Sequence, residues 1–136
     1  MQQLDDATLS LSSRIEFIET LSAKTDCVPF TTKSSWVGST AYLPPAIATL
    51  VLGRTQDPTK LIEEGKIGWP LLILHGTDDL LVDGTAVISN MTPLFKNVES
   101  HLIDDVGHIV FYDDEPGVAH HILRFINNVI ATNPYS

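Results

Sequence analysis

The chain has 136 residues, of which 43% are hydrophobic and 18% charged, and its formal net charge is −9. This composition is typical of one globular domain and excludes a disordered chain. An acidic surface repels phosphate groups, so we expect no nucleic-acid partner and no binding to anionic membrane surfaces. The single cysteine, Cys27, excludes an internal disulfide bond.

The first ten residues, MQQLDDATLS, carry neither the basic start nor the apolar core of a signal peptide. No apolar run reaches the ~18 residues that suggest a membrane-spanning helix. We therefore expect no membrane span and a cytoplasmic location, provided that Met1 is the natural start.

The first 68 residues predict a mainly helical region. Residues 1–23 show helical spacing of apolar side chains, at Leu4, Leu11, Ile15, Ile18 and Leu21. Residues 24–45 predict irregular chain, because prolines and a glycine lie among serines and threonines. Residues 46–52 predict a short helix. Asp57-Pro58 then predicts the start of another helix, for which Gly65 is the expected end.

The second half of the chain predicts alternating strands and helices. Residues 70–74, PLLIL, form a continuous apolar run, which is typical of a parallel strand covered by helices on both faces. A short helix over 84–91, an alternating strand over 98–103 and a loop over 104–114 follow. Residues 117–130 then predict an amphipathic helix, so the fold class is α/β.

Two short patterns follow the predicted strands. The first, H-G-x-x-D-x-x-V, comprises His75, Gly76, Asp79 and Val82. The second is a Gly-His pair followed by a Glu-Pro pair, formed by Gly107, His108, Glu115 and Pro116. In an open parallel sheet, functional groups lie on the loops beyond the carboxyl ends of the strands. We therefore expect Asp79 and His108 to emerge side by side.

These motifs and the terminal helix resemble the C-terminal end of α/β-hydrolases, in which an acid precedes a histidine in the chain. The resemblance is carried by residues 69–130, and residues 1–68 resemble the cap region that such proteins insert before their late strands. It implies a partial α/β-hydrolase fold, with a helical cap-like region (1–68) and a C-terminal strand-helix-strand-helix part (69–136).

The resemblance implies that Asp79 is the catalytic acid and His108 the catalytic histidine. Such a carboxylate accepts a hydrogen bond from one imidazole nitrogen, and the other nitrogen then takes a proton from a nucleophile. An unperturbed histidine suits this role because its pKa is about 6.5. Asp78 is the alternative acid, and Asp104 or Asp105 is an alternative partner for the histidine.

The remaining histidines predict no metal site and no cofactor. His75 is expected to order the turn after its strand, and His101 lies within the second predicted strand. His120 and His121 lie on the terminal helix, where no pair of ligands recurs at the one-turn spacing of H-E-x-x-H.

A serine hydrolase also needs a nucleophile, usually in G-x-S-x-G on a sharp strand-to-helix turn. No two of the eight glycines are four positions apart, so this motif is absent from the sequence. Ser39, in VGSTA, is the nearest imitation, but it precedes Asp79 by too few residues for a strand, its helix and a cap. No oxyanion loop of the HGGG type occurs either.

Two hypotheses follow. The chain is the C-terminal portion of a serine hydrolase for a small neutral or hydrophobic ester-like substrate, inactive alone, with Trp36, Tyr42 and Leu43 lining the substrate site. Alternatively, it is a catalytically inactive binding or interaction module derived from a hydrolase. Because two parallel strands make an inadequate sheet, we expect a missing N-terminal half or self-association to complete it.

Overall fold

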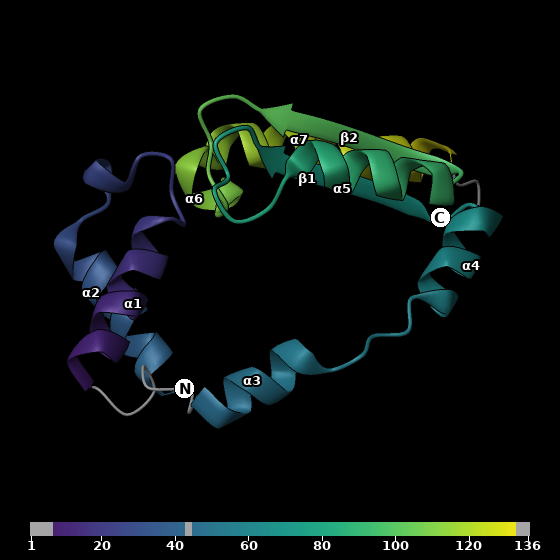
Figure 1. Cartoon of the computed structure of the whole chain (residues 1–136). Helices are drawn as coiled ribbons and strands as arrows, with labels where there is room; N and C mark the ends of the chain where they lie inside the picture. Colours follow the sequence, from purple (N-terminus) through teal and green to yellow (C-terminus); the bar gives the residue numbers. More distant parts are fainter. Residues whose placement is uncertain (1–6, 43–44, 133–136) are drawn as a thin grey trace.

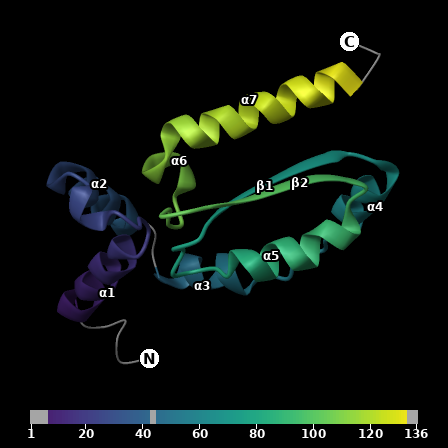
Figure 2. The same ribbon diagram turned by 90° about the horizontal axis from the view of Figure 1, so that it is seen from above.

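Two parallel strands, β1 (Pro70–Gly76) and β2 (Asn97–Ile103), form the sheet of this computed structural model, which describes residues 7–42 and 45–132. Their register pairs Pro70 with Asn97 and Gly76 with Ile103, so both strands end at the same edge. Helix α5 (Gly84–Met91) and the 3-10 turn η3 (Thr92–Leu94) connect them. Helix α5 lies on one face and α7 (Glu115–Thr132) on the other (Figures 1 and 2). This arrangement confirms the expected α/β class, with a small parallel sheet between helices.

The remaining helices lie around the two ends of the sheet. Helices α1 (Ala7–Glu19) and α2 (Phe30–Ala41), joined through the 3-10 turn η2 (Thr25–Cys27), lie beyond the carboxyl ends of the strands beside α6 (Val110–Asp113), as Figures 1 and 2 show. Helix α4 (Thr59–Ile67) lies at the opposite end. Helix α3 (Pro45–Gly53) stands apart from the sheet in Figure 1. The sheet end that carries the motifs therefore faces the first two helices.

The structure differs from the expectation of irregular chain over residues 24–45, because α2 forms within it. The prolines that argued against a helix flank it instead, and Pro29 is its N-cap, whose carbonyl accepts the N–H groups of Thr32 and Lys33. The Lys33 ammonium also lies 2.8 Å from the Glu19 carboxylate of α1. Packing against α1 therefore outweighs the weak helix propensity of this segment.

Helix α4 ends at Ile67, with Gly68 as its C-cap, and not at the predicted Gly65. Gly68 has φ +117°, a left-handed conformation that favours glycine, and its N–H returns to the Glu64 carbonyl. Gly65 is buried inside the helix against the Phe95 ring, where even a methyl group would lie 2.6 Å from a ring carbon. Gly65 thus serves close packing between α4 and the segment that joins η3 to β2.

The expected loop over residues 104–114 contains the short helix α6, so this prediction was wrong in part. The expected buried face of the first helix is also only partly buried: Ile18 is 4% exposed, whereas Leu11 and Ile15 are exposed. Leu4, the first member of that pattern, lies outside the described residues.

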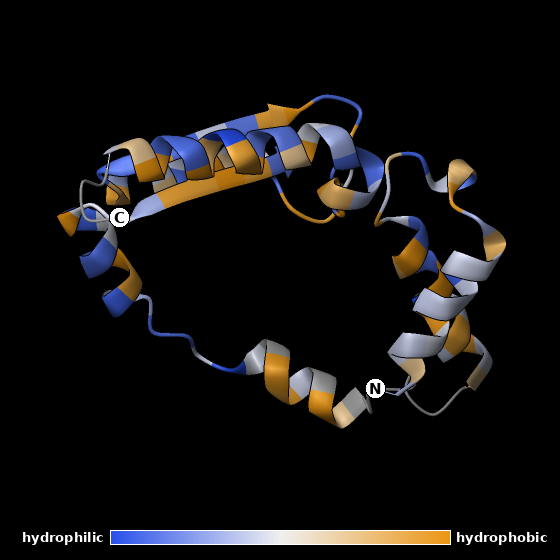
Figure 3. Ribbon diagram, turned by 180° about the vertical axis from the view of Figure 1, so that it is seen from behind, coloured by the Kyte–Doolittle hydropathy of each residue, from blue (hydrophilic) through white to orange (hydrophobic). Residues whose placement is uncertain are grey.

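The buried apolar core of the described residues is small, consisting of Ile18, Val28, Phe95, Val106 and Val118. In Figure 3, β1 is predominantly hydrophobic, yet Leu71 to Leu74 are only half-buried. Many large apolar side chains are exposed; those at 61–90% are Phe30, Tyr42, Leu50, Ile67, Trp69, Leu80, Phe111 and Leu123. None of the described helices is both long enough and apolar enough to cross a membrane.

Candidate active site

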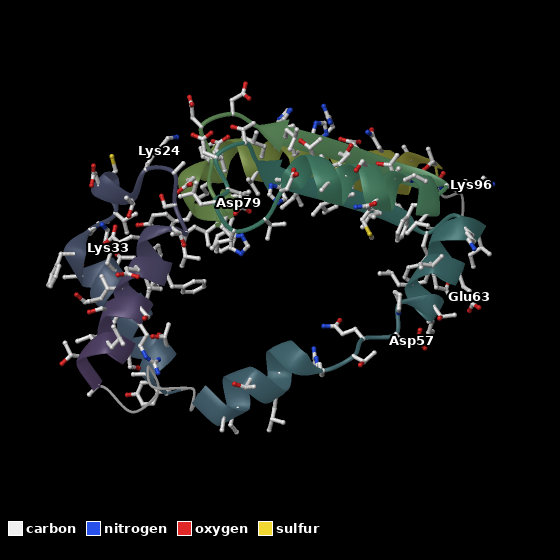
Figure 4. All side chains as sticks on the ribbon, in the orientation of Figure 1. Lys24, Lys33, Asp57, Glu63, Asp79 and Lys96 are labelled. Carbon is white, nitrogen blue, oxygen red and sulfur yellow. The ribbon has the colours of Figure 1, made fainter. Side chains whose placement is uncertain are left out.

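Asp79 and His108 meet beyond the carboxyl ends of the two strands. Asp79 lies three residues past the end of β1, and His108 lies five residues past the end of β2. The Asp79 Oδ2 and His108 Nδ1 atoms are 2.9 Å apart. Figure 4 shows Asp79 at the end of the sheet that faces α1 and α2, whereas Lys96 lies at the opposite end. The structure therefore brings the two predicted residues together.

The Asp79 carboxylate is held in a fixed orientation by the turn that follows it. Its Oδ1 atom accepts the backbone N–H groups of Leu81 at 2.8 Å and Val82 at 3.1 Å, and its side chain is 3% exposed. Burial favours the neutral form and is the largest single influence on this carboxyl group. The hydrogen bonds from the Leu81 N–H, from His108 and from the Val82 N–H together outweigh burial and lower the pKa of Asp79. The group is thus an ionised acceptor at neutral pH.

His75 packs beneath this pair and orders the end of β1. It is buried, its Nδ1 lies 3.0 Å from the Gly76 carbonyl oxygen, and its Nε2 lies 3.4 Å from Asp79 Oδ2. Gly84, at the start of α5, leaves room for this ring, since a methyl group there would lie 2.4 Å from His75 Nδ1. His75 therefore contacts the Asp79 carboxylate from the end of β1.

The loop that carries His108 is fixed by close backbone contacts. A methyl group on Gly76 would lie 1.9 Å from the Val106 carbonyl oxygen, which accepts the N–H of Asp78 at 3.0 Å. Val106 is 1% exposed, so its side chain anchors the loop in the core. The two strand-end loops thus contact each other directly, which places His108 over Asp79.

The Asp113 carboxylate ties the His108 loop to the segment after α1. Its Oδ2 accepts the N–H groups of Gly107 at 2.7 Å and Ala23 at 2.9 Å, and its Oδ1 accepts the Ser22 hydroxyl at 2.5 Å. The N–H of Ile109 also donates to the Leu21 carbonyl at 3.0 Å. The first helices are therefore attached directly to the residues that flank His108.

The three alternative acidic residues, Asp78, Asp104 and Asp105, are exposed and make other contacts. Asp78 is exposed and accepts a hydrogen bond from the Thr77 hydroxyl at 3.2 Å. Asp104 and Asp105 are both exposed, and the backbone N–H of Asp105 donates to Thr77. In the described part of the chain, His108 pairs with Asp79 and with none of these three residues.

The predicted substrate-binding residues are only partly placed. Trp36, on α2, makes an edge-to-face contact with Tyr112 of α6, with ring centroids 5.1 Å apart. Tyr42 ends α2 and is 90% exposed, and Leu43 lies outside the described residues. Their role stays a prediction.

The structure has one pocket beside Asp79 and another between the first two helices. One of about 480 Å³ adjoins Asp79 and runs between the end of β1 and the start of α5. A second, of about 300 Å³, lies between α1 and α2 and is lined mostly by apolar side chains, including Ile15, Phe30 and Val37. Neither is lined by Trp36 or Tyr42.

Ser39 lies on the surface of α2. Its hydroxyl donates to the Ser35 carbonyl four residues earlier, at 2.9 Å, and the residue is exposed. A helical serine of this kind lacks the strained strand-to-helix turn that a nucleophile elbow requires.

A second polar cluster, which the sequence did not predict, lies on the α7 face of the sheet. One ligand atom each of Glu99, His101 and His121 lies within 4.8 Å of the other two. Two of the residues come from β2 and one from α7, so a search for one-turn spacing within a helix overlooks them. The alternation Glu99-x-His101 on a strand is the signal that could have found two of the three.

Comparison with known proteins agrees with the fold. The family model described as alpha/beta hydrolase fold matches residues 5–115, so the chain belongs to the α/β-hydrolase fold family. A search of curated proteins gives no significant match.

Two solved structures are similar to this chain. One is a membrane phospholipase A described as a novel bacterial virulence factor (TM-score 0.69, 21% identity), of which the match covers 88% of this chain and 38% of that one. The other is a protein from Acinetobacter baumannii AYE described as a "putative lipase" (TM-score 0.70, 17% identity), with 96% and 44% covered. The chain thus spans about two fifths of the length of these structures, and at this identity the likeness shows the fold.

Proposed function

We propose that this chain supplies the acid and the histidine of a serine hydrolase that acts on esters or related acyl substrates. The observation that carries the proposal is the 2.9 Å contact between Asp79 Oδ2 and His108 Nδ1. The carboxylate fixes the imidazole with Nδ1 as donor, which leaves Nε2, on the opposite side of the ring, able to accept a proton. His108 is 39% exposed, so a reacting group can approach it.

The nucleophile in this proposal comes from a segment outside this sequence, since G-x-S-x-G is absent from it. His108 Nε2 would take the serine hydroxyl proton as the oxygen attacks the acyl carbonyl. It would then protonate the departing alcohol, and a water molecule would release the acid from the acyl-enzyme in the same way. Asp79 would stabilise the imidazolium at each step.

The comparisons support a lipid or other apolar ester as the substrate, because the two similar structures are described as a phospholipase and a lipase. The apolar pocket between α1 and α2 supports the same class, since α1 leads directly into the residues bonded to the His108 loop. Trp36, Tyr42 and Leu43 remain our candidates for contacts with the substrate.

The test is to join this chain to the polypeptide encoded in frame upstream, provided that the segment carries G-x-S-x-G, and to measure hydrolysis of p-nitrophenyl butyrate. We expect turnover in the joined protein. His108→Ala should lower kcat by about 10⁴-fold or more, since a serine without its base is a poor nucleophile. His120→Ala, an exposed histidine on α7, is the matched control and should retain full activity. Undiminished hydrolysis by the His108 variant would refute the assignment.

A second candidate, a binding module without activity, is supported by the sheet. Within the described residues each strand pairs along one edge only, which leaves polar backbone groups available to another strand. This candidate predicts a cooperative thermal unfolding transition for the 136-residue chain, self-association in size-exclusion chromatography and no esterase activity in any joined form. A chain that shows no cooperative transition alone would instead be an incomplete part of the hydrolase.

A further inference from the structure

The cluster between β2 and α7 presents three metal-binding side chains from two elements. Glu99 and His101 are two residues apart on β2, so their side chains share the face that α7 covers. His121 reaches this face from α7, and its ring centroid lies 4.1 Å from that of His101. A carboxylate and two imidazoles whose ligand atoms all lie within 4.8 Å of one another match the donor set of zinc sites with three protein ligands.

The two polar contacts of His101 Nε2 conflict with each other. His101 Nε2 lies 2.6 Å from Glu99 Oε1, a contact that requires the nitrogen to donate. The same nitrogen lies 2.8 Å from Arg124 Nη2, a donor that requires it to accept. One imidazole nitrogen cannot do both, so one of these contacts is repulsive in either tautomer.

His121 provides a second, independent sign. Its Nδ1 atom is buried and has no hydrogen-bond partner among the described residues. A buried polar nitrogen without a partner is unfavourable, and native proteins rarely leave one unpaired. A bound cation is one of the ordinary ways in which such a lone pair is satisfied.

We propose that Glu99, His101 and His121 bind one divalent transition-metal ion, with Zn²⁺ the best match. The ion would accept a lone pair from Glu99 and from each imidazole, which turns the conflict at His101 Nε2 into attraction. It would link β2 to α7, and its fourth position would be open to water. None of its ligands belongs to the Asp79–His108 pair, so this site is separate from the proposed active site.

Arg124 is the internal competitor for this site. Its guanidinium contacts both Glu99 and His101 Nε2, where it takes part of the place that a metal ion would fill. The Arg124 side chain is 43% exposed, so it can move into solvent when the ion binds. Metal binding would therefore exchange one cation for another within the cluster.

The test is a calorimetric titration of the full chain with ZnCl₂, with Co²⁺ absorption spectra as a second measure of ligand geometry. We expect one ion per chain in the wild type. His121→Ala should weaken binding by more than about 100-fold, because loss of a direct ligand should exceed the 10–100-fold cost of losing an outer-shell partner. Glu99→Gln, which keeps the size of the side chain, should also weaken it strongly.

Two further variants separate this site from chance binding by histidines. His120→Ala changes the neighbouring histidine on α7, whose ring centroid is 6.0 Å from that of His121, and should bind Zn²⁺ as the wild type does. Arg124→Gln should bind it roughly two- to fivefold more tightly, the equivalent of losing one exposed ion pair. The proposal is overturned if the wild type takes up no ion, if His121→Ala or Glu99→Gln keeps wild-type affinity, or if His120→Ala weakens binding as much as His121→Ala.

Discussion

The Asp113 carboxylate accepts the backbone N–H of Gly107, the residue that precedes His108. The same carboxylate accepts the Ser22 hydroxyl, 91 residues earlier in the chain. One acidic side chain therefore fixes both the loop of the candidate histidine and the helical segment that faces it. Figure 1 shows the consequence, with α6 between the sheet and the first two helices.

We expect Asp113→Ala to destabilise the protein and to loosen this junction. Loss of the carboxylate leaves the N–H groups of Gly107 and Ala23 without their acceptor, at a cost of about 1–3 kcal/mol in the free energy of unfolding. Hydrogen exchange should accelerate at Gly107, Ile109 and Ala23 before it does so in β1. Asp104→Ala, an exposed aspartate in the same loop region, is the control and should change little. Unchanged protection at Gly107 would contradict the role given to Asp113.

Two glycine substitutions should act in opposite directions. Gly38 lies in the middle of α2, and no atom beyond its own helical backbone and chain neighbours lies within 4 Å of an added methyl group, so Gly38→Ala should stabilise the protein by about 0.5–1 kcal/mol. In Gly76→Ala the methyl group would lie 1.9 Å from the Val106 carbonyl oxygen, where only a shift of the backbone can relieve the clash. We expect a loss of about 1–3 kcal/mol or more.

Urea denaturation of the two glycine variants beside the wild type measures both effects. A stable Gly76→Ala variant with an unperturbed His108 environment would show that the two strand-end loops do not need their close approach.

The parts of the fold that the sequence predicted are those with local patterns. The apolar run of β1, the alternation of β2 and the apolar face of α7 each fit within a short window of sequence. The start of α5 also depends on a local feature, since the Asp83 side chain caps the helix by accepting the N–H of Ala86.

The parts that the sequence did not predict depend on distant contacts. Helix α2 is rich in serine, threonine and glycine, and its contact partner α1 lies outside any local window. The sequence alone does not show which of Gly65 and Gly68 ends the helix. In the structure, the Phe95 ring packs against Gly65. For the site, Asp79 and His108 were singled out because their motifs resemble those of α/β-hydrolases and follow the ends of two predicted strands, and the structure places them in contact. Asp113 and the Glu99–His101–His121 cluster were missed because each joins elements far apart in the sequence.

The ionised Asp79 carboxylate should make stability depend on pH. Its pKa is lowered in the folded protein, so its contribution to stability is fully present above the pKa of the unfolded carboxyl group, about 3.9, and is lost as the pH falls through the lower folded-state pKa. We therefore expect Asp79→Asn to be less stable than the wild type by about 1–3 kcal/mol at neutral pH. The difference should shrink as the pH falls below about 4.

Urea denaturation of Asp79→Asn and the wild type over a pH series measures this difference directly. The other carboxylates with lowered pKa values, Glu19, Asp57 and Glu99, are present in both proteins and so cancel in the comparison. Asp78→Asn is the matched control, because this neighbour is exposed and the hydrogen bond given for its carboxylate comes from the adjacent Thr77 hydroxyl. A loss of equal size at every pH would mean that the introduced asparagine side chain packs badly, and that the charge which holds His108 in place contributes nothing to the fold.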